Sequence, residues 1–360
     1  MKARIIIGAN YGDEGKGTVV ANYTKKANNV LNILTNGGSQ RGHSILTKDG
    51  NITFQHFGAG TYHGADNYYS RFFILNPMQF VKEYEALIVK PKNIYRDRIC
   101  RWSTPYDSMA NVISEELQDR HASCGMGIWN TIKRCDNMAI VLFDEFLTME
   151  HPETYLKSVR SYYEKFLTIP DKWKDIWESP FLITHFIKDC KFMGEHTTPL
   201  NKAYDLNNLS YDELIFENGQ GLLLSDTGKD TYDTTPSDTG IKYSLNILQD
   251  LNIKDVTAHY VTRPYLTRHG DGELMNERSK YKLSNAILVD RTNHYNSFQG
   301  EFRYGQLDIK NLAYRILDDC AASGIPFELE VTHCDEMDRT KEFNKAFKDY
   351  KVNIYDSPLV

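Results

Sequence analysis

The N-terminal segment carries residue types suited to phosphate chemistry. A short apolar run at residues 5–7 leads directly into the sequence G-A-N-Y-G-D-E-G-K-G at residues 8–17. Glycines let backbone N–H groups approach phosphate oxygens, and the start of a helix favours an anion. Lys16 adds a positive charge suited to the β- and γ-phosphates of a nucleoside triphosphate. The segment therefore predicts a phosphate-binding loop between a strand and a helix.

This loop departs from the common P-loop at two positions. Asn10 stands where that pattern has its first glycine, and Gly17 stands where a serine or threonine would bind magnesium. The adjacent Asp13 and Glu14 are carboxylates inside an anion loop, and they repel phosphate unless a metal ion or a proton transfer compensates. We therefore expect Asp13 to hold Mg²⁺ or to move a proton. A plain glycine-rich turn with a solvated lysine is the alternative.

A histidine follows a second glycine-rich turn. Residues 36–43 read N-G-G-S-Q-R-G-H and come directly after the apolar run at residues 30–35. An imidazole at this place can donate a proton or a hydrogen bond to a phosphoryl oxygen as charge develops there. His43 is therefore a candidate catalytic residue, and a histidine that merely caps the turn is the alternative.

Short apolar runs and the helical stretches between them predict how these loops are positioned. Runs typical of buried strands lie at residues 4–8, 30–35, 138–143, 213–217, 256–261 and 327–331. Amphipathic stretches between them, for example residues 77–89 and 307–323, predict helices. Strands alternating with helices predict an α/β fold with a large, mostly parallel central sheet wrapped by helices. Polar glycine clusters directly follow most of these strands, so we expect one domain, residues 1–360, whose loops converge on one site.

Composition excludes several classes of protein. The 360 residues are 41% hydrophobic and 25% charged, which is typical of a globular chain. A formal net charge of −6 argues against nucleic acid as a partner. No apolar run reaches the ~18 residues of a membrane span, and the run at residues 5–7 is too short for a signal-peptide core. The six cysteines form no C-x-x-C pair and show no zinc spacing. We expect reduced thiols, no membrane partner and a cytoplasmic location.

The segment Y-G-D-E-G-K-G at residues 11–17 resembles the W-G-D-E-G-K-G loop of adenylosuccinate synthetases, which join aspartate to a 6-oxopurine nucleotide at the expense of GTP. Residues 36–43 are similar to the G-G-N-N-A-G-H loop of that family, in which the last glycine helps hold magnesium and the histidine acts on the phosphoryl group. The resemblance implies a P-loop-like fold, Mg²⁺ on Asp13 and Gly42, and catalytic roles for Asp13, Lys16 and His43. The triphosphate-binding residues that it implies are Gly12, Asp13, Glu14, Gly15, Lys16, Gly17, Gly42, His43, Thr332 and Asp335.

Later segments resemble the acceptor-nucleotide loops of the same family. S-C-G-M-G-I at residues 123–128 is similar to T-T-G-R-G-I, which binds the 5′-phosphate, and F-E-N-G-Q-G at residues 216–221 is similar to F-E-G-A-Q-G, whose glutamine contacts the purine. T-T-P-S-D-T at residues 234–239 resembles V-T-S-S-N-T, and T-R-H-G-D-G at residues 267–272 resembles S-T-R-V-G-A-G near the ribose, with His269 in place of valine. The purine monophosphate-binding residues thus implied are Ser39, Gln40, Ser123, Cys124, Gly125, Arg134, Gln220, Thr235 and His269.

Arg134 matches an arginine that the family contributes across a dimer interface to the phosphate of the neighbouring subunit. The resemblance therefore implies a homodimer, and a surface arginine on a helix is the alternative at this position.

Two further segments imply the aspartate site and the donor nucleotide. Residues 296–308 stand in the place of the family's aspartate-binding loop, which assigns Arg303, Gln299 and Gly300 to L-aspartate; one arginine can clamp a carboxylate through two parallel hydrogen bonds. T-H-C-D at residues 332–335 resembles T-K-L-D, whose aspartate pairs with guanine. Asp335 favours GTP, whereas His333 in place of lysine leaves ATP or dATP open.

The implied reaction begins when Asp13 takes the proton from purine N1 and the 6-oxygen attacks the γ-phosphorus; the amine of aspartate then displaces phosphate from C6. The compact chain resembles the archaeal and phage-type branch, which includes enzymes acting on dGMP. This resemblance favours dGMP as acceptor and 2-amino-2′-deoxy-N6-succinyladenylate, a diaminopurine DNA precursor, as product. It implies the host cytoplasm as the location if the protein is viral. Because Asp13 is present, IMP stays the alternative acceptor, and AMP biosynthesis is then the alternative function. A P-loop GTPase is disfavoured by Gly17, and a nucleotide-binding module without catalysis would not need Asp13 together with His43.

Overall fold

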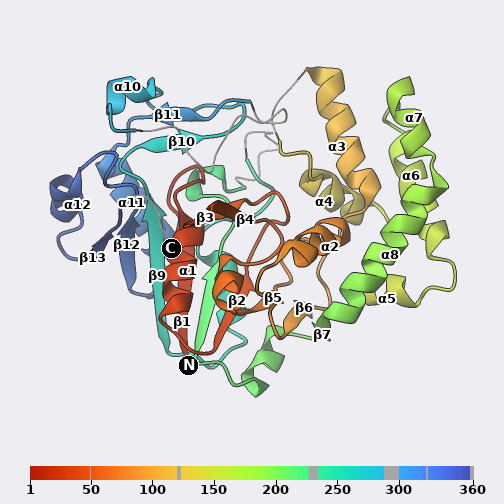
Figure 1. Ribbon diagram of the computed structural model, residues 1–360, viewed down its shortest axis with the longest axis horizontal. Helices are drawn as coiled ribbons and strands as arrows, with labels where there is room; N and C mark the ends of the chain where they lie inside the picture. Colours follow the sequence, from red (N-terminus) through yellow and green to blue (C-terminus); the bar gives the residue numbers. More distant parts are fainter. Residues whose placement is uncertain (49, 120–122, 227–233, 288–299, 322, 357–360) are drawn as a thin grey trace.

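A single parallel sheet organises the chain. The computed structural model describes residues 1–48, 50–119, 123–226, 234–287, 300–321 and 323–356. Its nine-stranded sheet has the order β13-β12-β9-β1-β8-β2-β5-β6-β7, and all neighbouring strands in it are parallel (Figure 1). The strands are β1 (Lys2–Gly8), β2 (Val30–Leu34), β5 (Asp66–Tyr69), β6 (Ile94–Asp97), β7 (Thr198–Leu200), β8 (Glu213–Glu217), β9 (Asp255–Thr262), β12 (Phe327–Val331) and β13 (Lys351–Ile354). The predicted α/β fold with a large parallel sheet is confirmed.

Two antiparallel pairs stand outside this sheet. Strand β3 (His43–Thr47) pairs with β4 (Gly50–Phe54), and β10 (Leu266–Arg268) pairs with β11 (Arg303–Gly305). Both pairs follow central strands, because β3 comes after β2 and β10 comes after β9.

The predicted central strands are present, and one predicted strand is wrong. Strands β1, β2, β8, β9 and β12 match predicted runs because a strand buried on both faces is almost continuously apolar. Residues 138–143 form no strand: helix α4 (Ile128–Asn137) ends just before them and helix α5 (Phe143–Thr148) begins at the last of them. The outer strands were not predicted because sequences such as D-N-Y-Y in β5 and K-V-N-I in β13 carry polar residues.

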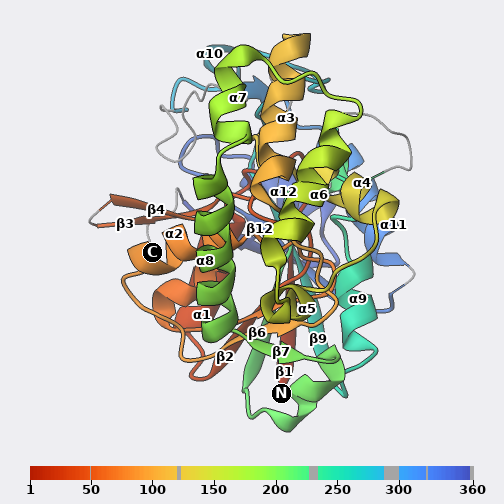
Figure 2. The same cartoon turned by 90° about the vertical axis from the view of Figure 1, so that its right-hand side faces the viewer.

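Helices cover both faces of the sheet. The predicted helices at residues 77–89 and 307–323 are α2 (Pro77–Ala86) and α11 (Ile309–Ala321). The helices from α3 (Pro105–Gln118) to α8 (Pro180–His196) pack together beyond the β6–β7 edge (Figures 1 and 2). The other α-helices are α1 (Lys16–Lys25), α6 (Pro152–Glu164), α7 (Asp171–Trp177), α9 (Lys242–Leu248), α10 (Lys280–Leu283) and α12 (Thr340–Ala346). Three short 3₁₀ helices in the described residues are η1 (Ala59–His63), η2 (Ala203–Asn208) and η3 (Leu222–Leu224). Among the described residues, no helix combines the length and apolar character of a membrane span.

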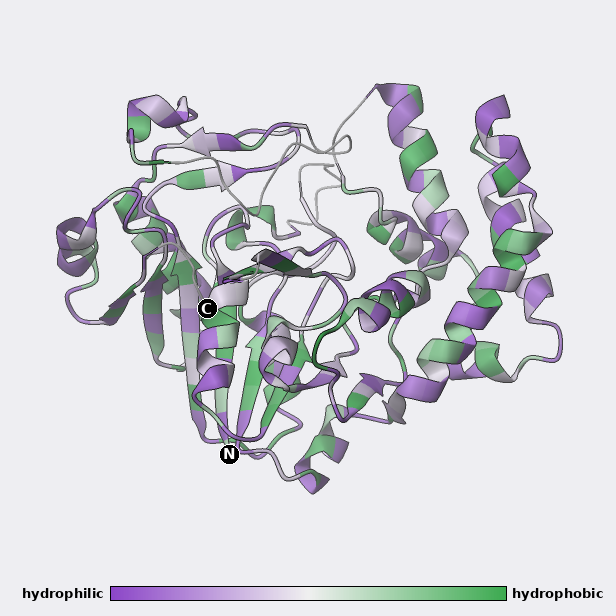
Figure 3. Cartoon of the chain, in the orientation of Figure 1, coloured by the Kyte–Doolittle hydropathy of each residue, from purple (hydrophilic) through white to green (hydrophobic). Residues whose placement is uncertain are grey.

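Alternate residues of β1 enter the two hydrophobic cores on either side of the sheet. Ile6 packs in a cluster with Val19 of α1, whereas Ile5 and Ile7 pack in a second cluster with Leu312 of α11. This alternation follows from the two-residue period of side chains along a strand. Figure 3 shows long green stretches, the colour of hydrophobic residues, in β2 and β8, whereas β9 and β12 are banded with purple.

Arg134 ties α4 to α3 inside the helical layer. Its side chain is 2% exposed, and its Nε donates to Oδ1 of Asp107 at 2.7 Å. The two terminal nitrogens donate to the Tyr155 hydroxyl at 2.9 Å and to the Trp102 carbonyl at 2.8 Å. The predicted contact of Arg134 with the phosphate of a neighbouring subunit is therefore wrong, because internal partners hold the guanidinium. The alternative of a surface arginine is wrong for the same reason.

Arg134→Met is expected to lower the free energy of unfolding by about 3–5 kcal/mol, because it leaves the buried Asp107 carboxylate without its charge partner. Urea denaturation measures this loss. Arg101→Met is the matched control, since Arg101 pairs with Asp136 at 2.7 Å with 42% and 55% of the two side chains exposed. That exposed pair should contribute at most about 1 kcal/mol. Equal losses in the two variants would contradict the structural role of Arg134.

Candidate active site

Loops at the carboxyl ends of the central strands enclose one cavity. Its volume is about 840 Å³, and the loops after β1, β2, β8 and β10 all contribute to its wall. Parallel α/β sheets bind ligands at this edge. The predicted site residues that line the cavity are Gly12, Asp13, Lys16, Gln40, Gly42, His43, Ser123, Cys124, Gln220, Thr235 and His269.

A small pocket shares part of the same wall. It is lined by the phosphate-loop residues 13–17, by Gly42 and His43, and by Arg263 and His333 from the loops after β9 and β12. The structure thus places Asp13, Lys16 and His43 around a single hollow, as expected if all three act on one phosphoryl group.

Glu14 stabilises the phosphate loop from within. Its Oε1 accepts hydrogen bonds from the backbone N–H groups of Asn10 at 3.0 Å and Gly12 at 2.8 Å. Its Oε2 lies 2.9 Å from Nζ of Lys16, and both side chains are only 2% exposed. Thr332 donates to the Glu14 carbonyl at 2.7 Å. One of the two carboxylates in the loop is therefore explained by the loop's own structure, and Thr332 supports the loop from β12.

Gly17 is required by the close packing of β3 on the first turn of α1. A Cβ atom at this position would lie 2.7 Å from the Ser44 carbonyl oxygen and 3.1 Å from the His43 carbonyl carbon. Serine or threonine therefore does not fit without moving the β3 backbone. The hydroxyl that binds magnesium in a P-loop GTPase is excluded here by packing.

Asp13 is held in an uncommon backbone conformation at the tip of the loop. Its φ is +61°, in the left-handed region, and its carbonyl accepts a hydrogen bond from Nε of Arg263 at 2.7 Å. Its Oδ2 lies 2.9 Å from Nδ1 of His269. Burial raises the pKa of Asp13, but the hydrogen bond and charge of His269 oppose this. With the further positive charges of Arg263 and Lys16, the pKa lies below its ordinary value, so the carboxylate is ionised at neutral pH.

A buried carboxylate holds His43. Oε1 of Glu217, at the end of β8, lies 2.5 Å from Nδ1 of His43 and 2.9 Å from Nη2 of Arg41. The backbone N–H of Ala59 donates to Oε2 at 3.0 Å. Burial, followed by the charge of Arg41, lowers the pKa of His43 to about 4, although Glu217 opposes the shift. The free site therefore holds a neutral imidazole whose Nδ1–H faces Glu217.

The other ring nitrogen of His43 is left for a ligand. Nε2 is buried and has no hydrogen-bond partner within the described part of the chain. Since buried polar atoms are normally paired, this atom indicates a missing polar partner in the pocket. Glu217 belongs to the F-E-N-G-Q-G segment but was not selected from the sequence; a carboxylate at the last residue of a central strand was the available signal.

Several polar groups in the segments predicted to bind the purine monophosphate also lack hydrogen-bond partners among the described residues. A Cβ on Gly37 would lie 2.9 Å from Nε2 of Gln40 and 3.2 Å from Oε1 of Gln220, so the two amides are neighbours. Both amide atoms of Gln40, Oε1 of Gln220, and the hydroxyls of Ser39 and Thr235 are buried without a hydrogen-bond partner among the residues described. Unpaired buried groups cost about 1–3 kcal/mol each, so these atoms indicate that a water molecule or a polar ligand pairs with them.

The loop before α4 is organised by Asn111 of α3. Its Oδ1 accepts hydrogen bonds from Oγ of Ser123 at 3.1 Å and from the backbone N–H of Gly127 at 3.0 Å. The backbone N–H of Gly125 donates to the same Ser123 hydroxyl at 3.1 Å. Burial raises the pKa of Cys124 to about 11, so this cavity-lining thiol is protonated. The amino end of α4 therefore faces the cavity, where it favours an anion.

Several cavity-lining residues were not predicted, and four of them are polar or aromatic side chains suited to a ligand. Asn111, Trp129, Lys133 and Arg268 line the cavity together with the predicted residues. The indole N–H of Trp129 donates to the Thr234 carbonyl at 3.3 Å and so joins α4 to the segment that carries Thr235. An asparagine, a tryptophan or a lysine on an amphipathic helix gives no sign in the sequence of which face meets a ligand.

Two of the predicted aspartate-binding residues, Arg303 and Gly300, are not among the residues that line the cavity. Nη2 of Arg303 donates to the carbonyls of Gly270 at 2.9 Å and Gly272 at 2.7 Å, and Nη1 lies 3.1 Å from Glu277. The guanidinium therefore holds the turn at residues 270–272 together. The prediction that it binds the carboxylate of aspartate is contradicted, because carbonyl oxygens of the protein already accept its hydrogen bonds. Gly300 has a φ of +70°, and a Cβ atom added there would meet no atom within 4 Å in the described structure beyond its chain neighbours. Gln299 lies outside the described residues.

Asp335 is exposed beyond the end of β12 and does not line either hollow. Its pairing with a guanine base stays a prediction. His333 lines the small pocket, which the sequence did not select as a site residue.

The residues of the small pocket fit Mg²⁺. The Asp13 carboxylate and the Gly42 backbone line the same hollow as Lys16, and carboxylate and carbonyl oxygens are the ligands that Mg²⁺ prefers in proteins. No hydroxyl at position 17 is needed if these oxygens and the triphosphate supply the ligands.

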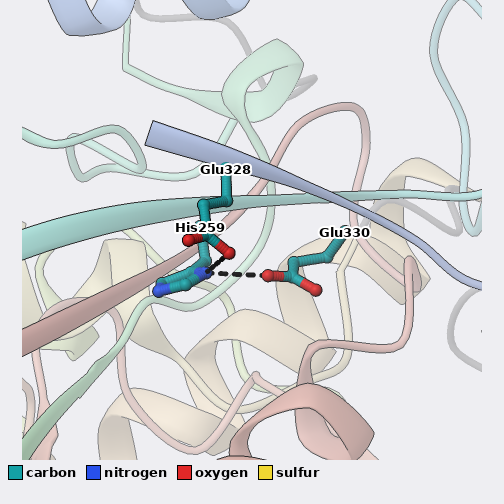
Figure 4. Close-up of side chains that lie close together, drawn as sticks. All are labelled: His259, Glu328 and Glu330. Atoms are coloured by element: carbon teal, nitrogen blue, oxygen red, sulfur yellow. Dashed lines mark hydrogen bonds and ion pairs between the residues drawn. The ribbon is translucent and has the colours of Figure 1, made fainter. Parts of the chain in front are cut away.

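A second group of candidate ligands lies on the sheet, away from the cavity. His259 on β9 and Glu328 and Glu330 on β12 point toward one another (Figure 4). Glu330 already lies 2.7 Å from Nδ1 of His259, and it accepts hydrogen bonds from the hydroxyls of Tyr23 at 2.8 Å and Tyr355 at 2.7 Å. Because protein donors use these oxygens, the group is a structural hydrogen-bond network between α1 and the sheet.

Comparisons with known proteins agree with this geometry. The family profile "Adenylosuccinate synthetase" matches residues 5–355. The adenylosuccinate synthetase of Finegoldia magna is 25% identical over 328 residues, which cover 88% of this chain and 75% of the relative. That of Blochmanniella pennsylvanica is 24% identical over 362 residues, which cover 97% and 80%.

Two solved structures share the fold. Fully ligated adenylosuccinate synthetase from Plasmodium falciparum has a TM-score of 0.69 at 19% identity and covers 94% of this chain and 78% of its own. Cyanophage S-2L succinoaminodeoxyadenylate synthetase, bound to dGMP and to dATP as an energy donor, has a TM-score of 0.67 at 12% identity and covers 98% and 92%. With the family profile spanning almost its entire length, the chain belongs to the adenylosuccinate synthetase family.

Proposed function

We propose that this protein is a ligase that joins L-aspartate to C6 of a 6-oxopurine nucleotide through a 6-phosphoryl intermediate, driven by GTP, ATP or dATP. One observation carries the proposal: Asp13, Lys16 and His43 line a single pocket at the end of the phosphate loop. A base, a phosphate-binding cation and a group for the phosphoryl oxygens are the three functions that phosphoryl transfer to a purine oxygen requires. Membership of the family supports the same reaction class.

The first step is phosphoryl transfer. The ionised Asp13 accepts the proton from purine N1, and the 6-oxygen forms a bond to the γ-phosphorus as the bridging bond to the nucleoside diphosphate breaks. Lys16 neutralises charge on the phosphates. His43 takes up a proton on Nε2 when the triphosphate binds and donates it in a hydrogen bond to a phosphoryl oxygen, while Glu217 accepts from Nδ1–H on the opposite side of the ring. Bound Mg²⁺, held by Asp13 and Gly42, would supply further neutralisation of phosphate charge. In the second step the amine of aspartate bonds to C6 and phosphate leaves.

Asp13→Asn and His43→Asn are each expected to lower kcat by about 10²–10⁴-fold, because each removes a group that acts in proton transfer or phosphoryl binding. Phosphate release that requires both aspartate and a purine monophosphate measures kcat, and calorimetry should show retained nucleotide binding. His151→Asn and Asp171→Asn are controls, since 70% and 94% of these side chains are exposed. Turnover at the wild-type level would remove the substituted residue from the mechanism.

The acceptor that we propose is dGMP. The compact chain is covered almost completely by the dGMP-bound phage enzyme, and the unpaired amide of Gln40 and hydroxyl of Ser39 offer hydrogen bonds to a purine edge that carries an additional amino group. IMP is the second candidate, because the curated relatives are named adenylosuccinate synthetases and Asp13 is present. We also propose a homodimer on the strength of the family, since Arg134 no longer supports it.

Among IMP, dIMP, GMP and dGMP, we expect dGMP to give the highest kcat/KM, at least about tenfold above dIMP, because a site that pairs with a 2-amino group leaves its own polar atoms unpaired when hypoxanthine binds. Steady-state phosphate release with each acceptor, repeated with GTP, ATP and dATP, tests this. A preference for IMP would transfer the assignment to AMP synthesis. Phosphate release from GTP alone, without acceptor or aspartate, would favour a GTPase.

A further inference from the structure

His269 contacts the carboxylate that the proposed reaction uses as its base. Its Nδ1 lies 2.9 Å from Oδ2 of Asp13, and 13% and 22% of the two side chains are exposed. Both residues line the cavity. The S-T-R-V-G-A-G loop that residues 267–272 resemble has valine here, which can make no such hydrogen bond.

The position of Asp13 is set from two sides. Arg263 holds the backbone through the Asp13 carbonyl at 2.7 Å, and His269 holds the side chain. The left-handed φ of +61° costs energy for a residue other than glycine, so the conformation persists only where its surroundings enforce it. The hydrogen bond from His269 uses one lone pair of Oδ2, so Oδ1 and the second lone pair of Oδ2 are left for Mg²⁺ and the purine.

His269 is itself held by a second set of contacts. Its ring packs on Phe302 with 4.6 Å between centroids. The turn that follows it is closed by Arg303, which donates to the carbonyls of Gly270 and Gly272. Arg303, which was predicted to bind aspartate, therefore begins a chain of contacts that runs from β11 through the turn and His269 to Asp13.

We infer that His269 is a positioning residue that fixes the Asp13 carboxylate for reaction with the purine. The inference rests on the proposed function, because Asp13 acts as the base there. A carboxylate displaced by about 1 Å from the reacting proton can cost about 10²-fold in rate. The imidazole itself need not touch the purine.

The test compares His269→Val with His269→Asn. The valine variant is expected to lose about 10–100-fold in kcat at nearly unchanged KM for the purine monophosphate, because the base is misplaced while the nucleotide contacts remain. Asparagine carries an N–H donor near the position of Nδ1, so it should recover a large part of the loss. In the Asp13→Asn background His269→Val should cause no further loss, and His151→Val, at an exposed histidine, should leave kcat unchanged. A full kcat in His269→Val, no recovery with asparagine, or multiplicative losses would overturn the inference.

A crystal structure of His269→Val supplies a readout independent of turnover. We expect the Asp13 carboxylate to rotate or to occupy more than one rotamer, and a single unchanged rotamer would overturn the inference. If His269→Val fails to fold, Phe302→Leu is the second variant. It loosens the packing around the His269 imidazole without removing the imidazole, and it should shift the same Asp13 carboxylate. An inactive wild-type enzyme would refute the proposed function, while the crystallographic result would still decide whether His269 positions Asp13.

Discussion

The candidate active site depends on one buried carboxylate, that of Glu217. It ends a central strand, is fully buried, and is shared by the Arg41 guanidinium and the His43 imidazole. An unpaired charge in this interior would be very costly, so the arginine and the backbone N–H of Ala59 must come with it. The consequence for chemistry is that His43 has one fixed ring nitrogen and presents the other to the pocket. Stability and reactivity at this position therefore arise from the same contacts.

Close packing at the phosphate loop also restricts the chemistry. The β3 backbone lies so near the first helical turn that only glycine fits at position 17, which removes the hydroxyl ligand of a GTPase. The same packing brings His43, the first residue of β3, beside the loop. The close packing that excludes the hydroxyl of a GTPase at position 17 therefore also places His43 where the proposed ligase reaction needs it.

Arginines that look like ligand-binding residues in the sequence have internal roles in this fold. Arg134 binds Asp107 inside the helical layer, and Arg303 closes the turn after His269. A guanidinium has five donors in a fixed geometry, and which carboxylate or carbonyl meets them depends on chain segments far away in sequence. Residue type and motif position could therefore suggest a cation here but not its partner.

The sequence by itself determined the parallel α/β fold, the glycine-rich loop after β1 and the approach of Asp13 and His43 to one pocket. Buried strands and the glycine-rich turns after them leave local patterns in the sequence, and parallel sheets gather such turns at one edge. It missed the outer strands, whose polar residues hide the pattern, and it misassigned residues 138–143, an apolar run too short to distinguish a strand from a connection between helices. Tertiary structure alone decided that Glu217 holds His43, that Glu14 stabilises its own loop and that His269 contacts Asp13. Each of these contacts needs a distance between segments that only the folded sheet brings together.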